Sequence, residues 1–409
     1  MFAFLKKLNR DHRNILYTCF FAFFCNGLLA LTMGSVLPDL KAVYALSDTT
    51  GGILLSAHSA GNLIAGFFSG VVPFYLGEKK SIVMLSSLSF LGMLMITLWG
   101  NTAFLLLAFL MVGIGRGSIS NFNNRTVNRL SGGSAAASNL LHSTFAVGAI
   151  SAPMFFLVLR NRFGWQAGLM FVVLAGCVSL FLLSRMKMSN DRPDKQNKDN
   201  RSMAFFKNPS FLILAAMLFC YLCSEYAING WLVTFIQSKQ ALVQEFGRSG
   251  KDAMTAIGAY SQSMATLLWT VMLAGRLTCA ALSAKVPQKT MMMVASFGVV
   301  AFFALMLQSN SVAAATMSVA GLGFCMAGIC PMIYSDAALF TNAYPLATGA
   351  LLGIGSSGAI LMPTLVGAVA EHAGFTGGMS VILVTVLLLA VFSVLNITVK
   401  TRLPHQAEA

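Results

Sequence analysis

An acidic side chain stands inside a long apolar run that begins near Pro209 and ends near Gln237. If this run is a helix, Tyr221, Glu225 and Asn229 recur at i, i+4 and i+8 and form one polar stripe. A carboxyl group at the middle of a bilayer costs about 3 kcal/mol on insertion scales, so by default it marks a pathway or a coupling site. The alternative is a protonated carboxyl that hydrogen-bonds a neighbouring helix for packing.

A basic side chain interrupts an earlier apolar run in a similar way. Arg116, Ser120, Asn123 and Asn124 follow i, i+4, i+7 and i+8, so they form a polar face that must look into a helix bundle or a cavity. Arg116 could pair with a carboxylate, bind an anionic or hydroxyl-rich solute, or extend to the membrane interface. The sequence leaves these three roles open.

Two histidines lie near asparagines at helical spacing. Asn139 and His142 are one turn apart, so they share a face and can both reach one ligand. His58 lies one position round from the face that carries Asn62. A histidine in a membrane helix either relays protons, because it titrates near physiological pH, or hydrogen-bonds a neighbouring helix.

A later apolar run carries a mixed polar and aromatic side. Gln262, Thr266, Trp269 and Thr270 lie along it. Hydrogen-bonding groups beside an aromatic plate suit a sugar-sized ligand. The alternative is packing by the polar groups together with a tryptophan at the membrane interface.

The elements that must position these side chains are membrane-spanning helices. The 409 residues are 57% hydrophobic and 10% charged, with a mean hydropathy of +0.76, which excludes a water-soluble globule of ordinary composition. The apolar runs are continuous rather than alternating, which excludes a β-barrel. We predict an all-α membrane protein with twelve transmembrane helices, near residues 15–38, 50–75, 81–99, 103–125, 135–159, 167–185, 209–236, 253–283, 289–308, 312–336, 344–370 and 376–398.

Charged side chains at the ends of these helices predict the topology. Pro38 is expected to end the first helix at the outer face, which would leave Asp39 and Lys41 as solvated loop charges. With the N-terminus inside, 20 of the 27 Lys and Arg residues fall on the cytoplasmic side and 6 outside, with Arg116 alone in the membrane. The positive-inside rule therefore predicts that both termini are cytoplasmic. The net charge of +14 then reflects topology and anionic lipid rather than nucleic-acid binding.

One long polar stretch separates the apolar runs into two equal sets. Residues 186–208 are charged, contain proline and are poor in hydrophobic side chains, a composition typical of a flexible linker. We therefore predict an N-terminal six-helix bundle at 1–185, a cytoplasmic linker at 186–208 and a C-terminal six-helix bundle at 209–409. Many secondary transporters are built from two such halves with their sites at the midplane.

These residues resemble the major facilitator superfamily, and within it the fucose permease-like sugar:proton symporters. A loop with Gly70, Gly77, Lys79 and Lys80 is similar to the family's loop between spans two and three. The resemblance to the branch covers most of the chain. It rests on Pro38 with Leu40, Gly113-x-Gly115 leading to Asn124-x-x-Val127, Asn139-Leu-x-His142 with Phe145 and Gly148, Tyr221-x-x-x-Glu225 before Gly230-Trp231, and Pro331, Gly349, Gly355, Gly358, Pro363 and Gly367.

Three positions depart from the pattern of the family. Phe74 stands where the loop usually has an aspartate, so the conformational lock attributed to that acid lacks it here. Gly34 and Ser120 align with the acids that fucose permease carries in spans one and four, so proton coupling through that pair cannot operate. Glu225 matches the acid that other members carry in span seven, and the resemblance makes it the candidate by elimination.

The resemblance implies a secondary active transporter that moves a small polar solute, a sugar or a sugar derivative, by alternating access coupled to protons. We predict Glu225 and His142 as proton-coupling groups. The predicted substrate-binding residues are Asn62, Arg116, Asn124, Asn139, His142, Tyr221, Asn229, Gln262 and Trp269. No catalytic residue, metal site or cofactor is expected, because the sequence has no metal-ligand cluster, phosphate loop or nucleophile paired with a base.

Other functions on the same fold stay open at this point. An exporter of drugs or metabolites by proton antiport is the main alternative, although Gly148-Ala-Ile-Ser-Ala-Pro153 lacks the paired glycines of many such antiporters. A receptor or scaffold that has lost transport is a third class. The expected partners are a small-molecule substrate, protons and the lipid bilayer, and we expect a monomeric multi-pass protein of the cell membrane, of the bacterial inner-membrane kind.

Overall fold

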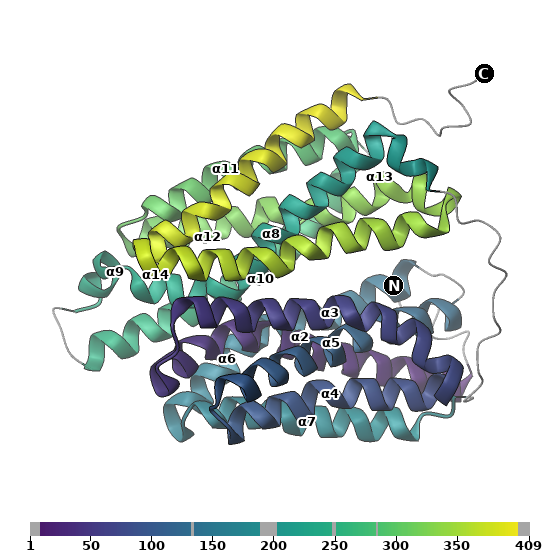
Figure 1. Cartoon of the computed structure of the whole chain (residues 1–409), viewed down its shortest axis with the longest axis horizontal. Coiled ribbons are helices and arrows are strands. Elements are labelled where there is room, and N and C mark those ends of the chain that lie inside the picture. Colours follow the sequence, from purple (N-terminus) through teal and green to yellow (C-terminus); the bar gives the residue numbers. More distant parts are fainter. Residues whose placement is uncertain (1–8, 132–134, 189–202, 248–250, 284, 400–409) are drawn as a thin grey trace. The chain divides into compact units, whose positions relative to one another are not determined.

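The computed structural model describes residues 9–131, 135–188, 203–247, 251–283 and 285–399. A few side chains within these ranges, that of Asn139 among them, lie outside the description. Regular structure in the described ranges is helical, as the continuous apolar runs predict (Figure 1). The elements are α2 (Arg10–Tyr44), α3 (Asp48–Leu76), α4 (Glu78–Leu98), α5 (Thr102–Leu130), α6 (Ala135–Phe163), α7 (Trp165–Arg185), η1 (Ala204–Lys207), α8 (Pro209–Ser238), α9 (Gln240–Glu245), α10 (Lys251–Leu282), α11 (Gln288–Gln308), α12 (Val312–Met326), α13 (Ile329–Ala343) and α14 (Pro345–Thr398).

Eleven helical segments in the described residues are long and apolar enough to cross a membrane, one of which, Val312–Phe340, consists of α12 and most of α13. The last, α14, has 54 residues, whereas about 20 suffice for one crossing. Gly374 interrupts it with φ 71° and ψ 171°, a conformation that glycine adopts without a steric penalty. Figure 1 shows the two straight runs of α14 meeting at a corner. They correspond to the predicted spans 344–370 and 376–398, while the count of twelve crossings and the cytoplasmic termini stay predictions.

The chain divides into two compact units, each of which is described by itself. The first unit contains residues 1–46 and 53–195, and the second contains residues 47–52 and 196–409. The first unit therefore holds α2, α4 to α7 and most of α3, and the second holds η1 and α8 to α14. Residues 189–202 of the predicted linker lie outside the described residues, so the domain limits at 185 and 209 stay predictions.

Glycines allow α2 and α6 of the first unit to cross at backbone contact. A Cβ atom added at Gly27 of α2 would clash with the carbonyl oxygen of Phe145 in α6. A Cβ atom added at Gly148 of α6 would likewise clash with the carbonyl oxygen of Phe24 in α2. Lipid tails are as apolar as the side chains, so membrane helices associate largely through close packing of this kind.

The first helix is longer than the sequence predicts. α2 continues through Pro38 to Tyr44, so the expectation that this proline ends the helix is wrong. A proline removes one backbone hydrogen bond, which membrane helices tolerate when neighbouring groups compensate. Asp39 is consequently helical rather than a solvated loop charge. Its carboxylate lies 2.7 Å from Nη2 of Arg160 in α6, and the aspartate side chain is 13% exposed.

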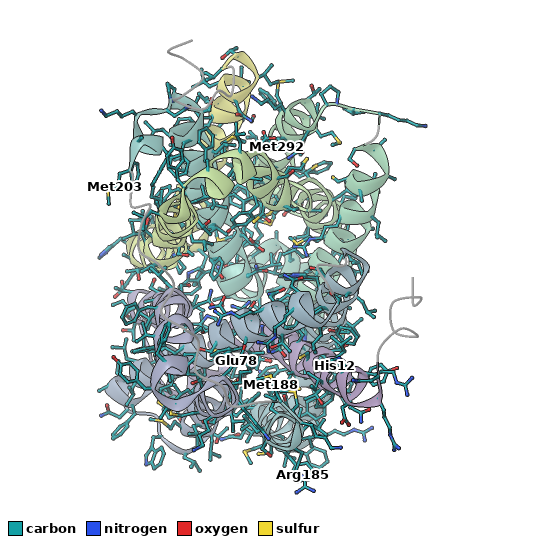
Figure 2. The ribbon with its side chains drawn as sticks, turned by 90° about the vertical axis from the view of Figure 1, so that its right-hand side faces the viewer. His12, Glu78, Arg185, Met188, Met203 and Met292 are labelled. Carbon is teal, nitrogen blue, oxygen red and sulfur yellow. The ribbon has the colours of Figure 1, made fainter. Side chains whose placement is uncertain are left out.

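Two further ion pairs lie at helix ends in the first unit. Arg129 Nη1 lies 2.8 Å from Glu78 Oε2 and joins the end of α5 to the start of α4, where Figure 2 labels Glu78. Lys187 Nζ lies 3.2 Å from Asp11 Oδ1 and joins the residues after α7 to the start of α2. Both acids occupy the first turn of their helix, where the helix dipole also favours a negative charge.

α8 is the central helix of the second unit. Its N-terminus is capped by Asn208, whose side chain accepts a hydrogen bond from the backbone N–H of Ser210, and Pro209 occupies the first turn. Much of the helix is buried, and it packs along α14. Trp231 Nε1 donates to the carbonyl oxygen of Pro363 in α14 at 3.0 Å, which fixes the two helices relative to each other.

Gly148→Ala is expected to lower the stability of the protein, because the added methyl group meets the Phe24 carbonyl and forces α2 away from α6. Overpacking of this kind typically costs about 1–3 kcal/mol. The measurement is the thermal unfolding midpoint of the purified protein in detergent.

The matched control is Gly66→Ala in α3, where an added Cβ atom meets nothing within 4 Å. This variant should keep or raise the midpoint, because alanine favours a helix over glycine. Equal midpoints for the two variants would contradict a backbone-contact crossing of α2 and α6.

Candidate functional site

The polar stripe expected from the sequence lies on α8. The helix spans Pro209–Ser238, so Tyr221, Glu225 and Asn229 share one face near its middle. Tyr221 is buried, whereas Glu225 and Asn229 are half-buried. The helix that the stripe requires is therefore confirmed.

Glu225 belongs to a group of polar side chains from three helices of the second unit. It interacts electrostatically with Tyr221 of α8 and with Cys330 and Tyr334 of α13. Arg276 of α10 also acts on Tyr221 and Cys330. A carboxyl group and a guanidinium thus share the same surroundings, and their opposite charges lower the cost of removing both from water.

Trp269 of α10 orients Asn229. Its Nε1 donates to the Asn229 side-chain oxygen at 3.0 Å, and the tryptophan is 5% exposed. The Cζ atom of Arg276 lies 5.9 Å from the centroid of the same indole, within range of a cation–π contact. Trp269 therefore connects Asn229 with Arg276. Gln262 lies two turns earlier on α10 and is buried.

Arg116 is at the centre of the polar group in the first unit. It lies half-buried midway along α5, with its Cζ atom 5.9 Å from the ring centroid of Phe145 in α6. His58 of α3 is buried and lies within electrostatic reach of it. Asn62, one turn further along α3, places its side-chain oxygen beside Gly117, the residue after Arg116. The structure therefore places Asn62 and His58 of α3 beside the segment of α5 that carries Arg116.

His142 is linked to this group through aromatic rings. It is exposed on α6, and its ring meets Phe23 of α2 edge-on at 5.4 Å. Phe23 also lies 5.9 Å from Phe145, the ring that Arg116 covers. The rings of Phe23 and Phe145 thus connect His142 with the arginine.

Two predicted residues of the first unit remain, Asn124 and Asn139, and only the side chain of Asn124 is described. Asn124 is half-buried on α5 and donates from Nδ2 to the Ser120 carbonyl of its own helix at 2.9 Å, so its side-chain oxygen and its second amide N–H are the groups that can meet a ligand. Asn139 belongs to α6, but its side chain lies outside the described residues. Its role stays a prediction.

Sequence reasoning missed Arg276 as a site residue and counted it among the cytoplasmic charges. It lies within α10, which continues to Leu282, and its Nε atom is buried with no hydrogen-bond partner in the described part of the chain. Gln262, Trp269 and Arg276 recur every seven residues. Helical periodicity therefore places the arginine on the same side as the predicted residues, a signal that the sequence already contained.

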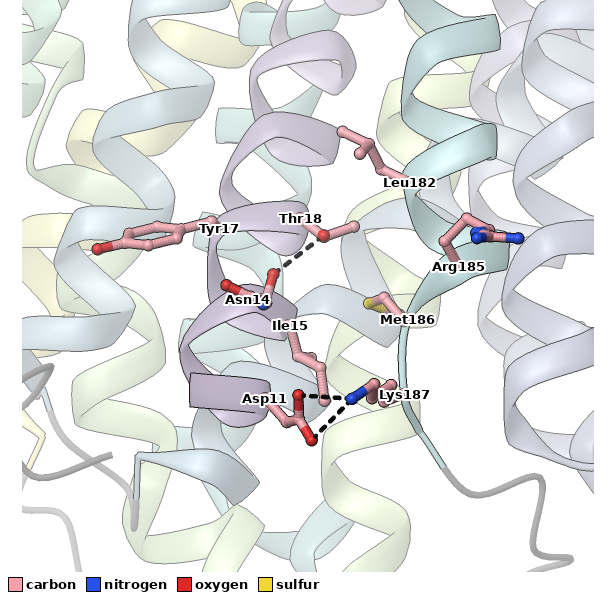
Figure 3. A pocket seen from close by; sticks show the side chains of 9 residues that line it. All are labelled: Asp11, Asn14, Ile15, Tyr17, Thr18, Leu182, Arg185, Met186 and Lys187. Atoms are coloured by element: carbon pink, nitrogen blue, oxygen red, sulfur yellow. Dashed lines mark hydrogen bonds and ion pairs between the residues drawn. The ribbon is translucent and has the colours of Figure 1, made fainter. Parts of the chain in front are cut away.

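A cavity of about 390 Å³ lies elsewhere in the first unit, between the start of α2 and the end of α7 (Figure 3). Asp11 and Lys187 form an ion pair at its rim, and Ile15 and Leu182 supply apolar wall. None of the predicted site residues lines it. Within the described ranges, no group of three or more His, Cys, Asp or Glu residues is placed to hold a metal ion.

Three comparisons with known proteins bear on the fold. A family model described as Major Facilitator Superfamily matches residues 19–339. Among curated proteins, the membrane protein MosC of Rhizobium meliloti is 22% identical over 361 residues, which are 87% of this chain and 83% of that protein. Of the solved structures, nucleoside transporter NupG has a TM-score of 0.72 at 14% identity and covers 95% of this chain and 99% of its own. A bacterial homolog of the human lysosomal transporter Spinster, inward-facing and occupied, has a TM-score of 0.73 at 13% identity and covers 96% and 98%.

Asn229→Leu is expected to lower the free energy of unfolding by about 1–3 kcal/mol, because it leaves the buried indole N–H of Trp269 without its acceptor. The measurement is thermal unfolding in detergent. In a Trp269→Phe background the donor is already absent, so the same substitution should cost less there. Additive effects of the two substitutions would contradict a hydrogen bond that matters to stability.

Proposed function

Since this chain belongs to the major facilitator superfamily, a family of membrane transporters, we propose that it is a secondary active transporter of a small polar solute, coupled to protons. The solute is a sugar or a sugar derivative, and transport proceeds by alternating access through twelve crossings. The observation that carries the proposal is Glu225 near the middle of the 30-residue helix α8, among polar side chains from α10 and α13.

Polar groups near the middle of both units support transport of a polar solute. A bilayer blocks such solutes, so the protein must replace their bound water with side-chain hydrogen bonds while it is open to one side only. In the first unit Asn62 lies beside Gly117, the residue after Arg116, and in the second unit Trp269 donates a hydrogen bond to Asn229. Asn124, Asn139, Tyr221 and Gln262 complete the proposed set for the solute.

Glu225 serves the proton in this proposal. A protonated carboxyl is neutral, so proton binding changes the electrostatic balance with Arg276 and thereby the relative stability of two conformations of the carrier. His142 is a second proton group in this proposal, since an imidazole titrates near physiological pH and this one is exposed on α6 rather than enclosed by other side chains.

A sugar or sugar derivative is supported by two lines. The residues that resemble the fucose permease-like branch include Tyr221, Glu225 and Trp231, which the structure places on one helix. NupG, which shares the fold, is a nucleoside transporter, and a nucleoside contains a sugar. The membership of that branch and the identity of the sugar are part of the proposal.

Glu225→Gln is expected to abolish solute-driven proton movement, because glutamine has the shape of the protonated carboxyl but cannot release a proton. The protein is reconstituted in liposomes that contain a pH-sensitive dye, and monosaccharides, sugar acids, polyols and nucleosides are added outside. A transported solute should acidify the lumen with the wild type and leave the pH unchanged with the variant.

Glu245→Gln is the matched control, since Glu245 lies in the short helix α9 and accepts from the backbone N–H of Val312. It should move protons as the wild type does. Undiminished acidification by Glu225→Gln would refute the assigned role, and alkalinisation of the lumen by the wild type would identify proton antiport, the exporter alternative.

A further inference from the structure

The first unit contains three described acidic residues, and each is paired at a helix end. Asp39 binds Arg160 at 2.7 Å, Glu78 binds Arg129 at 2.8 Å, and Asp11 binds Lys187 at 3.2 Å. None of these carboxylates is adjacent to Arg116. Within the described residues of its own unit, Arg116 therefore has no negative partner.

The described neighbours of Arg116 within the first unit carry no negative charge. Its guanidinium faces the ring of Phe145, and His58 of α3 lies within electrostatic reach. The side-chain oxygen of Asn62 lies beside Gly117, the next residue of α5. The Nε atom of Arg116 and the Nε2 atom of His58 are buried with no hydrogen-bond partner in the described part of the chain. The half-buried Arg116 and the buried His58 thus each have one buried nitrogen that lacks a hydrogen-bond partner among the described residues.

A charge midway along a membrane helix is costly when its own unit supplies no negative partner among the described residues, and natural membrane helices rarely keep such a charge without a function. The second unit differs, because its interior arginine has an acid nearby: Arg276 and Glu225 both act on Tyr221 and Cys330. The guanidinium of Arg116 needs an anion, and it offers the planar, two-pronged geometry that fits a carboxylate or a phosphate. The Phe145 ring holds the plane of the guanidinium by a cation–π contact.

We propose that the transported solute is an anion, a sugar acid or sugar phosphate, whose negative group is bound by Arg116 with His58 and Asn62 beside it. This assignment rests on the proposed transport function and names its substrate class. The negative group supplies the counter-charge that the described residues of the first unit lack, and the hydroxyl groups of the solute meet the amides of Asn62 and Asn124 in the same unit. Solute binding then neutralises a half-buried charge in the carrier.

The test compares anions with neutral compounds of the same skeleton. Purified full-length protein in detergent is heated with one compound at a time. The anions are glucuronate, galacturonate and glucose 6-phosphate, and their neutral counterparts are glucose and galactose. Each is added at 10 mM, on the order of 100 times a typical dissociation constant. At least one anion should raise the melting temperature by about 2 °C or more, and its neutral counterpart should not. Absence of a shift with every anion overturns the proposal.

Arg116→Gln should remove the shift. Arg116→Lys keeps the positive charge but lacks the two-pronged guanidinium, so it should keep part of the shift. A partial shift with Arg116→Lys also means that the fold tolerates a substitution at this position. Arg125→Gln is the matched control. Arg125 lies on the same helix, 5.8 Å from the ring of Phe122, but is exposed. That variant should retain the full shift.

The outcomes separate this inference from the transport function. Equal stabilisation of the wild type and Arg116→Gln by an anion overturns the role of Arg116. If a neutral sugar stabilises both the wild type and Arg116→Gln, the assignment of an anionic solute is overturned, while the proposal of sugar transport stands. Glu225→Gln should keep the anion-induced shift while it loses proton movement, so a failure of proton coupling is distinguishable from a failure of anion binding.

Discussion

An ionised side chain in an apolar helix requires a partner, because the bilayer offers no water to solvate it. The ion pairs of the first unit satisfy this requirement at helix ends, where they also join neighbouring helices. In the second unit, Glu225 and Arg276 share the surroundings of Tyr221 and Cys330. Among the described residues, these acids are thus positioned where a basic side chain can compensate them, and Arg116 is the interior charge without an oppositely charged partner in its own unit.

Close packing at glycines is what places these polar groups. α3 approaches α5 closely because Gly113 lets the backbone of His58 come into contact, and Gly117 makes room for Asn62. A larger side chain at either glycine would move α3 outward and take the asparagine away from Arg116. Packing and chemistry are therefore coupled in the first unit, and a glycine of the helix contact is also part of the site's geometry.

Much of the architecture was predictable from local patterns. Continuous apolar runs predicted the helices, and the spacing of Tyr221, Glu225 and Asn229 predicted their common face. The pattern failed at Pro38, because proline is a helix breaker in water but is tolerated in a membrane helix. It also failed at Arg276, because a basic residue near the end of a span has the same local signature whether it is solvated or stacked on Trp269.

The sequence by itself determined that the chain is a bundle of membrane helices and which side chains share a face, because hydropathy and helical periodicity are properties of neighbouring residues. Only the tertiary structure decided that Trp269 holds Asn229, that Asp39 pairs with Arg160, and that Arg116 lies against Phe145 and His58. These contacts join residues that are far apart in the chain. Their distances depend on how whole helices pack, which no local pattern encodes.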